Sequence, residues 1–77
     1  NPFNPETTIA FSIPHAGKVR LCVYDVLGIS VATLTDAVLP AGTHRVRYDG
    51  GQHNAGLYFY RLEWNGKALM RRMTLVK

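Results

Sequence analysis

The 77-residue sequence contains a single cysteine, Cys22, and no hydrophobic run long enough to cross a membrane. One cysteine cannot form a disulfide within the chain, so cysteine pairing gives no information about the redox compartment. A membrane-spanning helix needs about 20 consecutive apolar residues, and no cleavable signal peptide is recognisable either. We therefore predict a soluble domain in which Cys22 is a small side chain of a strand; if the protein is exported, its signal peptide is expected upstream.

Acidic residues are also scarce. Five Asp and Glu residues accompany nine Lys and Arg residues, which gives a formal net charge of +4. This charge favours anionic partners in general, but nucleic-acid binding requires a basic face within a recognisable module. The basic residues are instead spread along the chain, and they come close together only at Arg71, Arg72 and Lys77. We therefore predict no nucleic-acid partner.

Motifs of catalysis and metal binding are missing too. Residue types that a nucleophilic or acid–base site needs are present but scattered: Ser12, Ser30, Cys22, His15, His44, His53, Asp25, Asp36 and Asp49. None of them stands in a nucleophile elbow, a zinc-protease helix or a phosphate loop, and the histidines match no zinc-ligand spacing. We predict that the protein is not an enzyme and binds neither a metal nor another cofactor.

What the sequence does contain is a series of short strand patterns separated by proline- and glycine-containing turns. Apolar and polar residues alternate in 7–13, 18–25 and 44–50. In residues 29–39, Val31 and Leu34 are three positions apart, a spacing that suits either a helical turn or a strand with a bulge. The β-branched residues of this stretch favour the bulged strand.

The last part of the chain predicts a β-hairpin. Its two strand patterns are joined by Asn65 and Gly66, a pair that favours a two-residue type I′ turn. Counting outward from this turn places Tyr58 opposite Met73. The same count puts six apolar side chains on one face, which we expect to be core: Tyr58, Tyr60, Leu62, Leu69, Met73 and Leu75.

Six or seven short antiparallel strands, each apolar on one side, bury those sides as two packed sheets. We therefore predict an all-β fold, a small immunoglobulin-like or fibronectin-like β-sandwich. Two prolines hold the chain extended before the first strand. We expect residues 1–5 to form an N-terminal clamp and residues 6–77 to form the sandwich of a single domain.

Taken in order, these segments resemble the type A C-terminal sorting domain of the type IX secretion system of Bacteroidota and related bacteria. The resemblance covers the whole chain and is carried by NPFNPETTIAFSIP, VRLCVYDVLGISVATL, LPAGTHRVRYDG and GLYFYRLEWNGKALMRRMTLVK. Three residues depart from the family's commoner choices, namely Ile29, Tyr48 and Ala55.

The resemblance implies a small immunoglobulin-like domain at the C-terminus of a large exported cargo protein. Such a domain is recognised by the outer-membrane secretion machinery, and a processing peptidase typically removes it as the cargo passes from the periplasm to the cell surface or the medium. The implied recognition residues are Asn1, Pro2, Phe3, Asn4 and Pro5 in the opening motif and Gly56, Tyr58, Arg71, Arg72 and Lys77 in the terminal region.

A second interpretation is also open at this point. The domain is then an immunoglobulin-like structural, adhesive or carbohydrate-associated module of a multidomain surface protein or filament. The cations of the last strand suit both interpretations, because they discourage pairing between sheet edges and also offer a charged signal.

Overall fold

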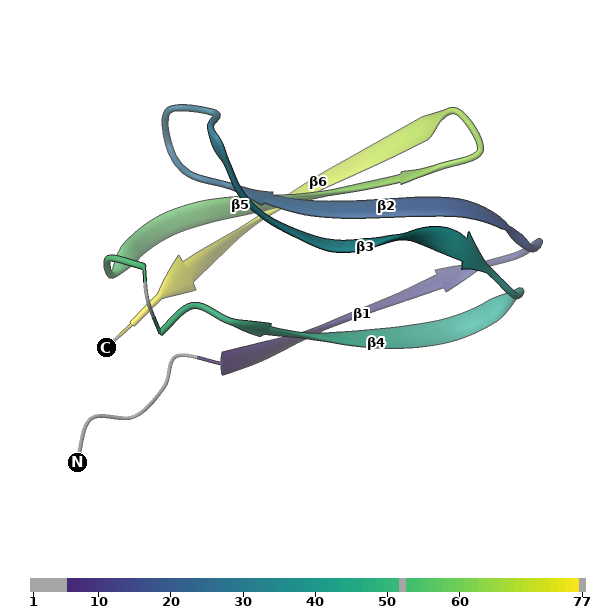
Figure 1. The fold of residues 1–77 in the computed structure, drawn as a ribbon, viewed down its shortest axis with the longest axis horizontal. Coiled ribbons are helices and arrows are strands. Elements are labelled where there is room, and N and C mark those ends of the chain that lie inside the picture. Colours follow the sequence, from purple (N-terminus) through teal and green to yellow (C-terminus); the bar gives the residue numbers. More distant parts are fainter. Residues whose placement is uncertain (1–5, 52, 77) are drawn as a thin grey trace.

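A computed structural model describes residues 6–51 and 53–76 and shows an all-β fold (Figure 1). Its six antiparallel strands are β1 (Glu6–Ile13), β2 (Gly17–Tyr24), β3 (Ser30–Leu39), β4 (Gly42–Asp49), β5 (Gly56–Trp64) and β6 (Lys67–Leu75). They form a two-stranded sheet in the order β1-β4 and a four-stranded sheet in the order β3-β2-β5-β6. The predicted all-β sandwich is confirmed. Within the described ranges, no helix is long and apolar enough to cross a membrane.

The core lies between the two sheets, and β2 forms its centre. Val19, Leu21 and Val23 alternate with polar or outward-facing residues and are fully buried. One half of the core surrounds Val19 and Leu21 and consists of Ile9, Ile13 and Leu62. The other half surrounds Val23 and consists of Tyr48, Tyr58 and Leu75. Full burial of a side chain of this size stabilises a fold by roughly 1.5–3 kcal/mol. The inward-facing residues of β2 therefore contribute to both halves of the core.

Strand β3 is bulged, as its β-branched residues favour. Two register shifts interrupt its pairing with β2, and each leaves one β3 residue, Leu34 or Val31, without a residue opposite. A bulge re-aims the side chain of the extra residue. Both side chains are half-buried and pack against the core. The three-residue spacing therefore reflects two bulges and not a helical turn.

The β5–β6 hairpin has the predicted register. Asn65 and Gly66 have positive φ angles of 51° and 74°, as a type I′ turn requires. Tyr58 lies opposite Met73, and the pairing continues without a shift to the end of β6. The turn residues therefore determine which side chains of the last two strands face the core.

Leu69 is the exception to the predicted core. Its partner across the hairpin, Leu62, is 9% exposed, whereas the Leu69 side chain is 44% exposed. The other five predicted core residues are buried or half-buried, namely Tyr58, Tyr60, Leu62, Met73 and Leu75. Figure 1 shows the reason, because the tip of the β5–β6 hairpin rises away from the β1-β4 sheet, which is too narrow to cover all four strands. The prediction for Leu69 was therefore wrong, although its register is correct.

This difference between paired leucines gives a stability prediction. Leu62→Ala should lower the free energy of unfolding by about 2–5 kcal/mol, because it leaves a cavity in the core. Leu69→Ala should lower it by less than about 1 kcal/mol, because that side chain is largely in solvent. Urea denaturation of the two variants measures both values, and equal losses would contradict the described packing of β6.

Candidate recognition surface

The start of β1 and the end of β6 lie at the same end of the sandwich. Glu6 lies opposite Asp49 in the β1-β4 pair, and Leu75 lies opposite Gly56 in the β5–β6 pair. The β4–β5 loop brings the two pairs together, because Gly50 at its start lies directly against the side chain of Leu75. A Cβ added to Gly50 would be only 2.7 Å from Cδ1 of Leu75. Figure 1 shows the purple start of β1 and the yellow end of β6 on the same side. We call this region the terminal end: the start of β1, the β4–β5 loop and the end of β6.

Three rings fill the interior of the terminal end. The His53 ring stacks on Tyr48 with ring centroids 6.1 Å apart, and its centroid lies 6.2 Å from that of Tyr58. The Tyr58 hydroxyl donates a 2.6 Å hydrogen bond to the Asn54 carbonyl. The His53 amide donates a 2.9 Å bond to the Gly50 carbonyl. These contacts tie the β4–β5 loop to the core at the point where β5 begins.

The hydroxyl of Tyr48 differs from that of Tyr58. It is buried and has no hydrogen-bond partner among the described residues. Burial raises the pKa of the Tyr48 phenol above its usual value of 10.0, and the charges of Tyr58 and Asp49 add smaller effects in the same direction. Desolvation disfavours the phenolate, so the folded protein holds this group in its neutral form.

The recognition residues implied by the resemblance occupy different environments. Gly56 begins β5 with a φ of 145°, a conformation that favours glycine. Tyr58 is 7% exposed and contacts the core. Arg71 and Arg72 are exposed on β6. The remaining members lie outside the described residues, namely Asn1, Pro2, Phe3, Asn4, Pro5 and Lys77. Among the described members, Gly56 and Tyr58 shape the terminal end, while the two arginines are accessible to a partner.

The β2–β3 loop is an exposed element that the sequence only partly predicted. Asp25 Oδ1 accepts hydrogen bonds from the amides of Leu27 and Ile29 at 2.9 and 3.0 Å, and Gly28 has a φ of 81°. The loop therefore holds Val26, Leu27 and Ile29 in solvent, where they are 64%, 79% and 57% exposed. An aspartate three residues before a glycine predicts the turn, but the exposure of its apolar side chains follows from tertiary structure.

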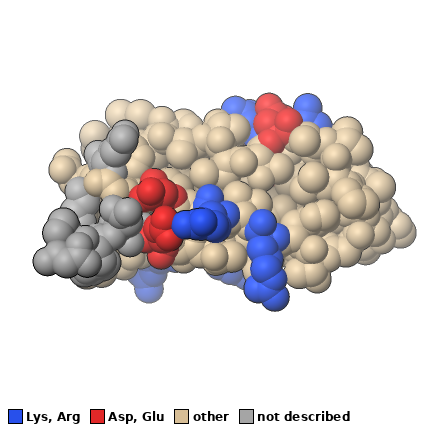
Figure 2. Space-filling view, turned by 60° about the horizontal axis from the view of Figure 1, so that its bottom comes forward, with Lys and Arg blue, Asp and Glu red and all other residues tan. Residues whose placement is uncertain are grey.

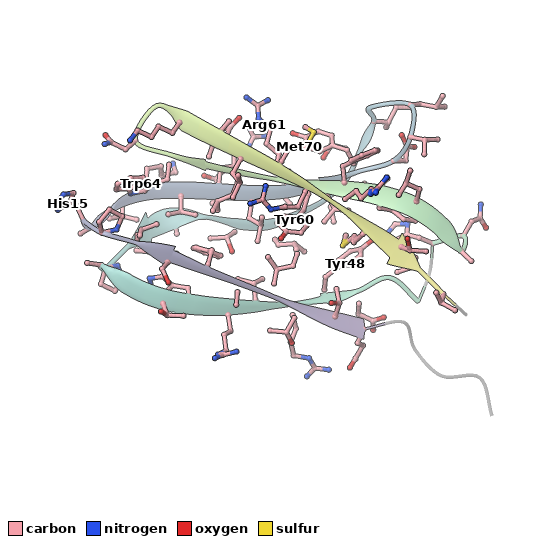
Figure 3. The ribbon with its side chains drawn as sticks, turned by 180° about the vertical axis from the view of Figure 1, so that it is seen from behind. His15, Tyr48, Tyr60, Arg61, Trp64 and Met70 are labelled. Carbon is pink, nitrogen blue, oxygen red and sulfur yellow. The ribbon has the colours of Figure 1, made fainter. Side chains whose placement is uncertain are left out.

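Potential catalytic side chains are not gathered in one place. His15 stacks on Trp64 with centroids 6.5 Å apart at one end of the molecule (Figure 3). His53 belongs to the β4–β5 loop and stacks on Tyr48. Cys22 is buried. Among residues 6–51 and 53–76, no three potential metal ligands lie close enough together to hold an ion. The scattered distribution seen in the sequence is thus retained in space.

The chain as a whole matches a known family model. The model of the secretion system C-terminal sorting domain matches residues 1–76. The chain belongs to this family, the sorting domains of type IX secretion. No curated protein and no solved structure is significantly similar to it. The resemblance found in the sequence is therefore confirmed.

The two buried tyrosines of the sorting domain form a matched pair for mutation. Tyr58→Phe should lower the free energy of unfolding by about 1 kcal/mol, because it removes the hydrogen bond to the Asn54 carbonyl. Tyr48→Phe should leave that free energy unchanged or raise it, because its buried hydroxyl has no partner among the described residues. Urea denaturation compares the two variants, and a larger loss for Tyr48→Phe would contradict the described hydrogen bonding.

The raised pKa of Tyr48 also predicts a dependence of stability on alkaline pH. Below the unfolded-state pKa of 10.0 the phenol is neutral in both states and has no effect. As the pH rises from there through the folded-state pKa, the unfolded state ionises first, so the sorting domain loses stability. Thermal melts between about pH 8 and 11 should show a steeper fall for the wild type than for Tyr48→Phe. Parallel curves would count against the raised pKa.

Proposed function

We propose that this domain is the signal that directs an attached cargo protein through the type IX secretion system to the cell surface or the medium. The observation that carries the proposal is the match of the sorting-domain family model to residues 1–76. In this proposal residues 1–77 are one domain, and residues 1–5 are the clamp that joins it to the cargo. The domain acts by being recognised after export to the periplasm, and it catalyses no reaction.

The partners in this proposal are the cargo, the outer-membrane secretion machinery and its processing peptidase. The geometry of the terminal end supports this assignment. Glu6, which follows the junction with the cargo, belongs to the same end of the sandwich as Leu75, the last residue of β6. In this proposal a partner that contacts the end of β6 acts at the same end of the sandwich as Glu6, the residue that follows the clamp.

Exposed charge on β6 supports recognition of this strand. Arg71 and Arg72 are exposed, and neither has an ion-pair partner among the described residues. Uncompensated surface charge steers a partner of opposite charge without a large effect on stability. The charges of β6 are therefore suited to binding more than to holding the fold.

A secretion assay with a reporter fused ahead of residues 1–77 tests the proposal in a host that has the machinery. The reporter with the domain should reach the medium or the cell surface, whereas the reporter alone should remain in the periplasm. The double change Arg72→Glu with Lys77→Glu should melt normally, because surface changes usually alter stability by less than about 0.5 kcal/mol. It should nevertheless accumulate in the periplasm.

The matched control is Arg20→Glu with Arg45→Glu, which changes the net charge equally at two exposed positions away from β6. This control should be exported normally. Export of the reporter without the domain would refute the sorting function and favour a structural or adhesive module. Normal export of the Arg72 and Lys77 variant would retain the sorting function and assign recognition to shape instead of charge.

A further inference from the structure

Strand β6 is a free and regular edge of the four-stranded sheet. It pairs with β5 on one side without a register shift, and no described strand pairs with its other side. The two-residue turn makes Trp64 and Lys67 a hydrogen-bonded pair, and hydrogen-bonded positions alternate along an antiparallel ladder. The backbone groups that point away from β5 are therefore those of Ala68, Met70, Arg72 and Thr74.

The opposite edge of the same sheet is protected in a way that β6 is not. Proteins blunt exposed edges with bulges, prolines or charges, because a regular edge accepts another strand. Two bulges interrupt β3, whereas β6 contains neither a bulge nor a proline over its nine residues. Of these three protections β6 has only charge. Its positive charge repels basic strands and attracts acidic ones.

The first two-thirds of β6 are exposed on both faces of the sheet. All residues from 67 to 72 are exposed. On one face Leu69 is 44% exposed, and on the other Met70 is 54% exposed. An added strand would cover part of both side chains while it satisfies the outward backbone groups. Figure 3 shows Met70 beside Arg61 on the side of the sheet turned away from β1 and β4.

Charge decides which strand can add to this edge. Lys67, Arg71 and Arg72 are the charged residues of β6, and it carries no acid. The five carboxylates of the chain are all engaged elsewhere: Glu6, Asp36 and Glu63 in ion pairs, and Asp25 and Asp49 with loop amides. Figure 2 shows Asp and Glu side chains next to Lys and Arg side chains on the face that it presents. A second copy of β6 would double the cations along the edge without adding a carboxylate, and like charges on neighbouring strands repel.

We propose that β6 is a docking edge for an extended, acidic segment of the secretion machinery, which adds to the sheet as a further strand. The segment pairs with the outward backbone groups of Ala68, Met70, Arg72 and Thr74. Its carboxylates lie beside the guanidinium groups of Arg71 and Arg72, and main-chain pairing with charge complementarity gives both affinity and register. The assignment of this segment to the secretion machinery rests on the function proposed above.

A proline at Met70 tests the backbone pairing directly. The Met70 amide points away from β5, so Met70→Pro removes a donor that only an added strand would use, and proline is tolerated at such edge positions. Met70→Ala is the matched control, because it removes the same side chain but keeps the amide. In the reporter assay Met70→Pro should be exported about tenfold less than Met70→Ala, because the two variants lack the same side chain and differ by one backbone hydrogen bond. Their melting temperatures should be similar. Equal export of the two variants would overturn the proposal.

A photocrosslinking measurement keeps the proposal testable if Met70→Pro fails to fold. The photoreactive residue p-benzoylphenylalanine replaces Ala68 on the free edge, and in a control reporter it replaces Val38, which is 71% exposed on β3. The Ala68 position should crosslink to an Asp- or Glu-containing segment of a machinery protein, and the adduct should be lost when Arg71 and Arg72 are changed to Gln. An adduct between two copies of the domain, an adduct with polysaccharide, or no adduct would overturn the proposal.

These outcomes separate the docking edge from the sorting function. If the reporter requires residues 1–77 for export but exports normally with Met70→Pro, the sorting function stands and the docking edge is wrong. If the reporter is exported without residues 1–77, the sorting function itself fails.

Discussion

The unequal width of the two sheets is the constraint on which the rest of this structure depends. Two strands, β1 and β4, cover a sheet of four, so the core is limited to the inner face of β2 and the parts of its neighbours that β1 and β4 reach. Small domains bury a modest share of their surface, and here the uncovered share falls on the tip of the β5–β6 hairpin. The exposure of Leu69 and of Arg71, which lie on the same face of β6, follows from this mismatch.

Contacts at the terminal end add to the packing that the two-stranded β1-β4 sheet provides. The side chain of Leu75 is buried and packs against the backbone of Gly50. The His53 ring packs against both Tyr48 and Tyr58. These contacts involve the β4–β5 loop and the ends of strands distant in sequence. The β4–β5 loop therefore has a structural role that its glycines alone do not reveal. It follows the end of β4, which pairs with the start of β1, and it packs against the end of β6.

Local patterns in the sequence predict most of this fold, since they are set by backbone chemistry. Asn65 and Gly66 specify the turn and, with it, the register of β5 and β6, and the β-branched residues around Val31 and Leu34 favour a bulged strand. The exposure of Leu69 and of the β2–β3 loop depends instead on which surfaces another sheet covers, and that is a property of tertiary structure. The proposed recognition surface is predictable only as far as the family motifs and the cations of the last strand define it.

Stability and the proposed recognition place different demands on β6, and different parts of the strand meet them. Residues Met73 and Leu75 pack into the core, whereas residues 67–72 are exposed. Truncation of the C-terminus therefore removes core side chains together with any signal, so a loss of export after truncation does not distinguish misfolding from lost recognition. Substitutions confined to residues 67–72 leave Leu75 in place. For this reason residues 67–72 are the part of β6 where the proposed binding can be altered while the fold is retained.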